Sequence, residues 1–188
     1  MISIFGSIIE SLPYYHNIET TLSGMNMIVT RTGYTGEIGY EIYLKNAQRD
    51  GIKLWNTMLE AGKSYNISPG GPSLIRRLEH GIRNYGQDMR LENNPYEVGL
   101  GFTVDLDQKA DFIGKEALIQ IKGQKLKQKI VGIEFGTERM KGWNEDCWPV
   151  MENGKQIGSV TTAAYSPGLK KNIGFAMLPI EKPEMGTK

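Results

Sequence analysis

A tyrosine and a glutamate beside a glycine-rich segment are the residues of this chain best suited to bind a ligand. Residues 29–43 read VTRTGYTGEIGYEIY, in which Tyr34 and Glu41 stand seven positions apart. A carboxylate accepts N–H hydrogen bonds and a tyrosine offers a flat face and a hydroxyl, so this pair suits a planar heterocycle with N–H donors. Tyr43 follows Glu41 by two residues and is expected on the same face of a strand. The alternative is an ordinary hairpin with exposed polar side chains.

The residues around this segment predict two β-strands joined by a tight turn. Apolar, β-branched and aromatic residues lie on both sides of the segment, as is typical of a hairpin. Gly33, Gly36 and Gly39 allow the backbone to bend sharply or to approach a flat ligand closely. The segment is therefore expected to hold the pair formed by Tyr34 and Glu41.

Two helices are expected after the hairpin. Asn46 is a suitable N-cap for a helix over 47–64, which has an apolar stripe. Pro72 is well placed at the start of a second helix, whose apolar residues recur with a helical period over 74–85. The charged residues of that helix, Arg77 among them, are then expected on its solvated face.

The second half of the chain is predicted to be rich in β-structure. A strand over 98–106 and a short helix over 115–121 precede a connector rich in lysine and glutamine. Asn153-Gly154 is a type I′ hairpin signal between two of the later runs. Short β-like runs occupy 130–135, 148–151, 156–163 and 173–178. Four short strands do not close a barrel, so the fold class is α+β with an incomplete small β-barrel at the C-terminal end.

Composition excludes several classes of function. Lys plus Arg number 22 and Asp plus Glu 21, and no basic block occurs, which argues against nucleic acid as a partner. No apolar run is long enough to span a membrane, and two histidines leave no plausible metal site. The single cysteine, Cys147, excludes an intrachain disulfide and fits a reducing, cytoplasmic location. Its neighbours Trp143 and Trp148 predict a packed thiol.

Several further motifs occur in an order that identifies a family. They are Arg77-Leu78-Glu79-His80-Gly81, Tyr85-Gly86-Gln87-Asp88-Met89, Asn94-Pro95-Tyr96-Glu97-Val98-Gly99-Leu100-Gly101, Asp111-Phe112-Ile113-Gly114-Lys115-Glu116-Ala117-Leu118 and Ser166-Pro167-Gly168-Leu169-Lys170-Lys171-Asn172-Ile173-Gly174. With the segment 29–43, they resemble the folate-binding aminomethyltransferase family, which includes the glycine cleavage system T-protein and dimethylsulfoniopropionate demethylase relatives. The resemblance implies a fragment that lacks the family's N-terminal part and C-terminal end.

The resemblance also implies a site for tetrahydrofolate. In this family, the residues that match Tyr34 and Glu41 contact the pterin, and a tyrosine at Tyr43 resembles one that lines the substrate pocket. Ser73 and Ile82 depart from positions at which relatives contact folate, which favours a divergent branch. The family's catalytic aspartate lies in the missing N-terminal part, so no catalytic residue is expected here. The remaining acids are expected as turn or surface charges: Glu37, Asp88, Glu97 and Asp105.

The predicted function is transfer of a methyl or aminomethyl group from an amine or sulfonium donor to tetrahydrofolate, with the demethylase branch preferred. The predicted domains are 1–122, part of the folate-binding domain, a linker over 123–129, and a partial barrel over 130–188. A small-molecule one-carbon donor is the expected partner, with a carrier protein if the chain is a true T-protein. The alternatives are a non-catalytic folate-binding or scaffold member, against which Gln124 counts because scaffold members have Lys-Gly-Cys there, and an inactive truncated fragment.

Overall fold

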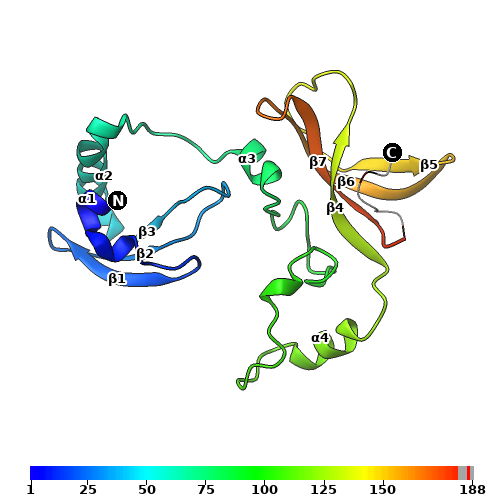
Figure 1. Cartoon of the computed structure of the whole chain (residues 1–188), viewed down its shortest axis with the longest axis horizontal. Coiled ribbons are helices and arrows are strands. Elements are labelled where there is room, and N and C mark those ends of the chain that lie inside the picture. Colours follow the sequence, from blue (N-terminus) through cyan, green and yellow to red (C-terminus); the bar gives the residue numbers. More distant parts are fainter. Residues whose placement is uncertain (182–185, 187–188) are drawn as a thin grey trace. The chain divides into compact units, whose positions relative to one another are not determined.

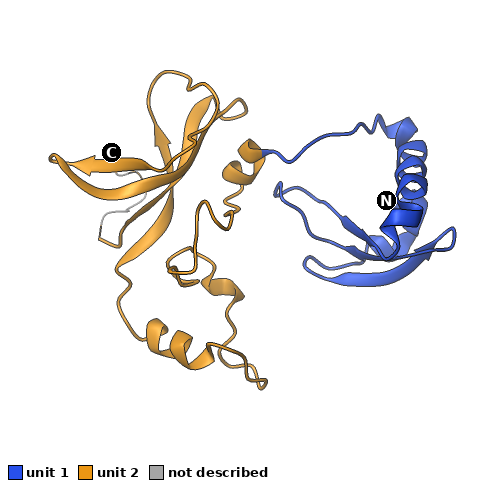
Figure 2. Ribbon diagram, turned by 180° about the vertical axis from the view of Figure 1, so that it is seen from behind, with its two compact units in different colours: residues 1–73 blue, residues 74–188 orange. Residues whose placement is uncertain are grey.

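The chain forms two compact units, Met1–Ser73 and Leu74–Lys188 (Figure 2). This computed structural model describes residues 1–181 and 186, so the last part of the predicted 130–188 domain lies outside the described residues. Each unit combines helices with one antiparallel sheet (Figure 1), which confirms the predicted α+β class.

The first unit is a three-stranded sheet with helices on one face. The sheet has the order β1-β2-β3, and both pairs of strands are antiparallel. Its elements are α1 (Ile2–Phe5), η1 (Ser7–Ile9), β1 (Asn17–Leu22), β2 (Met25–Thr30), β3 (Glu41–Leu44), α2 (Ala47–Gly62) and η2 (Lys63–Tyr65). The predicted helix over 47–64 is thus confirmed, although the Asn46 side chain makes no capping hydrogen bond.

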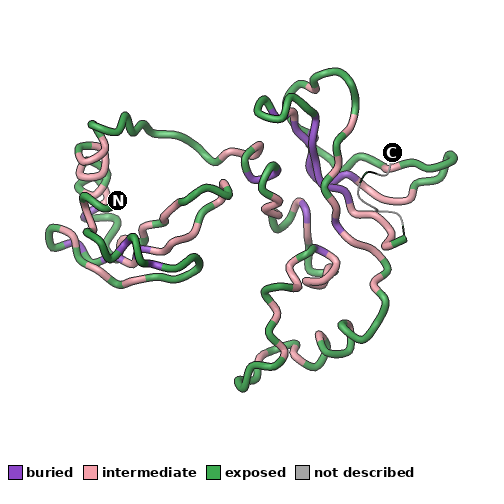
Figure 3. The backbone as a smooth tube through the Cα atoms, viewed as in Figure 1, coloured by how far each residue is buried: buried purple, intermediate pink, exposed green. Residues whose placement is uncertain are grey.

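Buried and more exposed residues alternate along β2, and the buried ones show where the core of this unit lies. Met25, Met27 and Val29 are buried, whereas the residues between them are more exposed (Figure 3). Ile9 of η1 and Leu54 of α2 pack in the same cluster, so the helices cover the face that these residues share. The other face of the sheet carries most of the polar residues of the three strands: Asn17, Glu19, Thr21, Asn26, Thr30, Glu41 and Tyr43.

The predicted hairpin exists, but the tight turn is wrong. β2 ends at Thr30 and β3 begins at Glu41, and these two residues pair directly in the register. The intervening residues 31–40 form an irregular loop with no strand of its own. Of the three glycines in this loop, only Gly36 has a positive φ, at 74°, so the other two serve close approach and not a reversed backbone.

The second unit contains a four-stranded antiparallel sheet in the order β4-β7-β6-β5. Its elements are α3 (Leu74–Glu79), η3 (Gly101–Thr103), α4 (Lys115–Lys122), β4 (Gln128–Phe135), β5 (Trp148–Glu152), β6 (Lys155–Ser166) and β7 (Lys171–Pro179). All four predicted strands are confirmed, and β4 and β5 form opposite edges of an open sheet. Asn153 and Gly154 have φ values of 50° and 77°, as the predicted type I′ turn requires.

The second predicted helix is much shorter than its apolar pattern suggests. α3 ends at Glu79, because Gly81 adopts a φ of 72°. The Ile82 N–H donates to the Arg77 carbonyl at 2.8 Å and the Gly81 N–H to the Leu78 carbonyl at 3.1 Å. This pair of bonds is a Schellman motif, which ends a helix at a left-handed glycine. Gly81 was the sequence signal for the end of the helix, but the apolar period over 74–85 predicted a longer helix.

The predicted strand over 98–106 is wrong. This stretch consists of turns and η3, and Gly99 has a φ of 71°, which is incompatible with extended backbone. Val98 is nevertheless buried in the core cluster that contains Leu78 and Phe175. The apolar residues of this stretch therefore fill the core from a loop.

Three predictions about exposure are also wrong. Arg77 is fully buried and Asp88 is 2% exposed, so neither is a surface charge. Their side chains form an ion pair of 2.6 Å that no helical period could indicate, because Asp88 lies in a loop. Cys147 is exposed and is not packed between its tryptophan neighbours.

Candidate functional site

Glu41 presents its carboxylate on the open face of the first sheet. It is the first residue of β3, it is exposed, and it pairs in the register with Thr30. One carboxylate oxygen, Oε2, accepts hydrogen bonds from the Thr32 hydroxyl and from the Tyr43 hydroxyl, the latter at 3.3 Å. Neither of these bonds uses Oε1. The carboxylate is therefore oriented by its neighbours while one oxygen stays available to an N–H donor.

Tyr43 lies on the same face as Glu41, as its spacing predicted. Its side chain is 54% exposed, and its hydroxyl reaches the Glu41 carboxylate. The negative charge of Glu41 raises the pKa of Tyr43 above its ordinary value of 10.0, because a phenolate beside a carboxylate is unfavourable. Tyr43 thus remains a neutral hydrogen-bond donor at physiological pH.

Tyr34 is less closely joined to this group than the sequence suggests. It lies in the loop 31–40 and is half-buried, and no hydrogen bond links it to Glu41 in the described part of the chain. The ends of the loop are fixed to the elements before the sheet. The Tyr40 hydroxyl donates to the Ile9 carbonyl at 3.1 Å, and Arg31 Nη1 donates to the Leu12 carbonyl at 2.9 Å.

Gly33 and Gly39 form the neck of the same loop. A Cβ added to Gly39 would lie 3.3 Å from the Thr32 carbonyl oxygen and 3.8 Å from the Gly33 Cα. The two arms of the loop therefore approach each other closely at Gly33 and Gly39, near Glu41. A side chain at Gly39 would push the arms apart. This approach keeps Thr32 within reach of the Glu41 carboxylate.

The open face extends over three strands, one of which the sequence analysis missed. β1 contributes Asn17, Glu19 and Thr21, and the alternation of these polar residues with Ile18 and Leu22 was the available sequence signal. The register aligns these residues with β2 and β3 in three rows. The rows are Asn17, Thr30 and Glu41, then Glu19, Ile28 and Tyr43, and finally Thr21, Asn26 and Lys45.

The two positions that depart from the family's folate contacts lie outside this face. Ser73 is the last residue of the first unit, and Ile82 belongs to the second. The Ile82 carbonyl accepts a hydrogen bond of 3.0 Å from Arg77 Nη1, so its backbone supports a buried network. Within the described residues, no helix has the length and apolar character needed to cross a bilayer. Nor do these residues contain a group of three or more side chains able to hold a metal ion.

Comparisons with known proteins identify the family. Residues 6–108 match the family described as GCVT N-terminal domain, and residues 128–188 match that described as Glycine cleavage T-protein C-terminal barrel domain. The chain belongs to the glycine cleavage T-protein family. This finding confirms the resemblance drawn from the sequence motifs.

Relatives in this family share the sequence and the fold of the chain. An aminomethyltransferase of Geobacillus sp. (strain WCH70) is 41% identical over 90% of this chain and 46% of its own length. An aminomethyltransferase of Bacillus subtilis (strain 168) is 37% identical over 93% of this chain and 48% of its own length. The crystal structure of glycine cleavage system aminomethyltransferase T from Bartonella henselae superposes with a TM-score of 0.78 at 25% identity, over 95% of this chain and 48% of that one. The chain spans about half the length of these relatives.

Proposed function

We propose that this chain binds tetrahydrofolate on the open face around Glu41 and serves in the transfer of an aminomethyl group to it. The observation that carries the proposal is the Glu41 carboxylate, which is exposed and oriented by Thr32 and Tyr43 through one oxygen only. The aminopyrimidinone edge of a pterin offers N–H donors, and the free Oε1 of the carboxylate can accept from them with charge-assisted bonds. The Glu41 carboxylate therefore fits the N–H edge of the pterin.

The residues of this chain would bind and orient the folate. Glu41 would hold the pterin edge, Tyr43 would border it on the same face, and Tyr34 would contact it from the loop 31–40. Bound tetrahydrofolate supplies the nitrogen that receives the one-carbon unit. The contribution of this chain is to hold that nitrogen in place for a bound donor, because fixed geometry replaces a bimolecular encounter at large effective molarity. No residue of the chain is proposed as an acid or base.

An aminomethyl donor is favoured over a sulfonium donor. The relatives described above are named aminomethyltransferases, and they give the predicted demethylase branch no support. With an aminomethyl donor, a carrier protein that presents the aminomethyl group would be the partner. The linker over 123–129 and a cytoplasmic location remain predictions from the sequence.

Isothermal titration of the purified chain with tetrahydrofolate tests the proposal. Glu41→Gln keeps the shape of the side chain and removes its charge, and it should weaken binding by about 1.5–3 kcal/mol, or roughly tenfold to a hundredfold. Glu60→Gln is the matched control, since it removes the same charge from the exposed surface of α2. Equal affinity of the two variants, or no binding by the unaltered chain, would contradict the proposal.

A further inference from the structure

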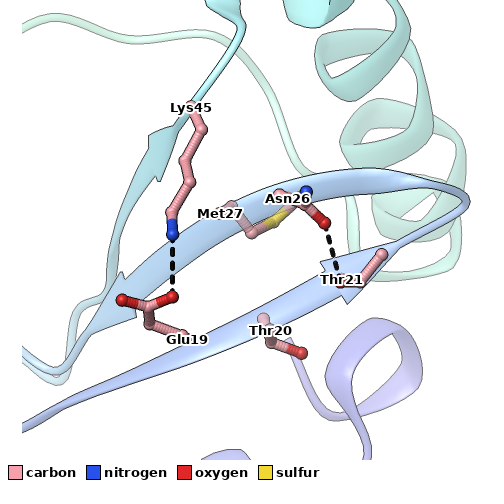
Figure 4. A pocket seen from close by; sticks show the side chains of 6 residues that line it. All are labelled: Glu19, Thr20, Thr21, Asn26, Met27 and Lys45. Carbon is pink, nitrogen blue, oxygen red and sulfur yellow. Dashed lines mark hydrogen bonds and ion pairs between the residues drawn. The ribbon is translucent and has the colours of Figure 1, made fainter.

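The open face of the first sheet has a hollow at the end opposite to Glu41. It measures about 290 Å³ and lies beside the third row of residues, where β1, β2 and the end of β3 meet. Figure 4 shows that two polar contacts cross it. The residues that line it are Glu19, Thr20, Thr21, Asn26, Met27 and Lys45.

Lys45 supplies the positive charge in this hollow. Its Nζ donates to Glu19 Oε2 at 2.7 Å, and the two side chains are 46% and 69% exposed. An ammonium has three N–H donors, so this contact leaves donors available. An exposed ion pair of this kind contributes only about 0–1 kcal/mol, so a competing carboxylate can replace Glu19 at little cost. The neighbouring Thr21 hydroxyl and Asn26 side chain are joined at 3.0 Å and add polar atoms to the same hollow.

Lys45 is aligned with Glu41 by the strand itself. Glu41 and Tyr43 alternate along β3 on the open face, and Lys45 continues this alternation, with its N–H bonded to the Asn26 carbonyl at 3.0 Å. The four residue steps from Glu41 to Lys45 span about 13 Å of extended backbone. Tyr43 lies between them, and its direct partner in the register is Ile28. The face thus presents, in order, a carboxylate, an aromatic and apolar strip, and an ammonium group.

We propose that the hollow at Lys45 binds the glutamate tail of the folate whose pterin lies at Glu41. The inference rests on the proposed function and extends it to a second contact on the same face. A folate has three parts in a line, namely the pterin, an aromatic p-aminobenzoyl group, and a glutamate with free carboxylates. Their chemistry matches the three features of the face in the same order. The aromatic group packs on Tyr43 and Ile28, and a tail carboxylate pairs with Lys45.

Glu19 gives this site a distinctive behaviour. Its carboxylate pairs with Lys45 and repels a tail carboxylate that approaches. Removing the charge of Glu19 therefore frees Lys45 and should strengthen binding of the tail, whereas removing the charge of Lys45 should weaken it. Opposite effects from two partners in one ion pair are not expected if that pair only stabilises the fold.

Titration with two ligands separates the tail from the pterin. Tetrahydrofolate and tetrahydropterin, which lacks both the p-aminobenzoyl group and the glutamate tail, are compared at low ionic strength, where screening is weak. Lys45→Met should weaken binding of tetrahydrofolate by about three- to fivefold and leave tetrahydropterin unchanged. Glu19→Gln should strengthen binding of tetrahydrofolate by about two- to threefold. Lys63→Met is the control, because Lys63 forms a similarly exposed pair with Glu60 on α2.

The outcomes distinguish the two proposals. If tetrahydropterin binds and Glu41→Gln weakens this binding by roughly tenfold or more, the proposed function stands. An unchanged affinity of Lys45→Met for tetrahydrofolate would then overturn the tail site alone. An equal loss for both ligands would also overturn it, since the effect would not come from the tail. If neither ligand binds the unaltered chain, both proposals fail together.

Discussion

The buried pair of Arg77 and Asp88 should contribute more to the stability of the second unit than any exposed ion pair. Both side chains are fully buried, and Arg77 Nη1 lies 2.6 Å from Asp88 Oδ2. The Asp88 carboxylate also accepts hydrogen bonds from the Asn84 N–H at 2.8 Å and from the Thr161 hydroxyl at 2.8 Å. Arg77 in turn donates to the Thr162 hydroxyl at 3.0 Å, which joins α3 to β6. Both oxygens of the carboxylate therefore accept hydrogen bonds, and the side chain is out of contact with the solvent.

Asp88→Asn tests this network with little change in shape. The substitution leaves the Arg77 charge buried without its counter-charge, and breaking a buried pair in this way costs about 3–5 kcal/mol. Because urea lowers the free energy of unfolding by about 1–3 kcal/mol per molar, the midpoint should fall by roughly 2 M. The comparison is Glu134→Gln in the exposed pair with Lys171, whose side chains are 60% and 54% exposed. That change should cost about 1 kcal/mol or less.

Tryptophan fluorescence during urea unfolding reports on the relevant unit. Trp143 and Trp148 lie in the second unit and Trp55 in the first, so a Trp55→Phe background isolates the signal. A loss of less than about 1 kcal/mol in Asp88→Asn, equal to that in Glu134→Gln, would refute the reasoning. Such a result would mean that water reaches the ion pair and that burial does not determine its contribution to the free energy of unfolding.

Three further predictions rest on local geometry. Glu41→Gln should lower the pKa of Tyr43 toward 10.0, because the Glu41 charge is the main cause of its rise. ¹³C NMR of labelled tyrosine measures this pKa, and Tyr43→Phe assigns the signal. An unchanged titration of Tyr43 would contradict the prediction. Gly51→Ala should stabilise the first unit by about 0.5–1 kcal/mol, because Gly51 lies inside α2 with open space around it. Gly174→Ala should destabilise the second unit by about 1–3 kcal/mol or more, since a Cβ there would overlap with the Thr162 carbonyl oxygen. Urea unfolding distinguishes these two glycines, and equal effects would contradict the packing argument.

Local signals predicted the regular elements of this chain well. α2, α4 and the four strands of the second sheet each have a clear apolar pattern within one continuous segment. The Asn153-Gly154 turn was equally predictable, because its conformation depends on these two residues alone. The positive φ values of Gly81 and Gly99 were not predicted, and they end a helix at the first position and prevent a strand at the second. In both places an apolar pattern continued past a glycine, since the residues beyond it still reach the core from a loop.

The candidate site was only partly accessible from the sequence. Glu41 and Tyr43 share a face because alternation along a strand is a local property. Lys45 follows the same rule, but its role in the hollow depends on its ion pair with Glu19. Glu19 lies on β1, which is separated from β3 by β2. The pairing of Arg77 with Asp88 and Thr162 is likewise a property of tertiary contacts and has no sequence period. The sequence identified the residues, but it did not show which residues distant in the chain contact them.

Strand register ties the open face to the core of the first unit. Val29 pairs with Ile42 and Met27 with Leu44, and all four side chains belong to the core cluster. A shift of β3 by one residue would turn Ile42 and Leu44 outward and drive the Glu41 carboxylate into the core, at a cost that no ligand contact offsets. The core therefore fixes which way Glu41 faces. Because the residues of the open face add little to that core, their substitution should change ligand binding and leave the register, and with it the fold, intact.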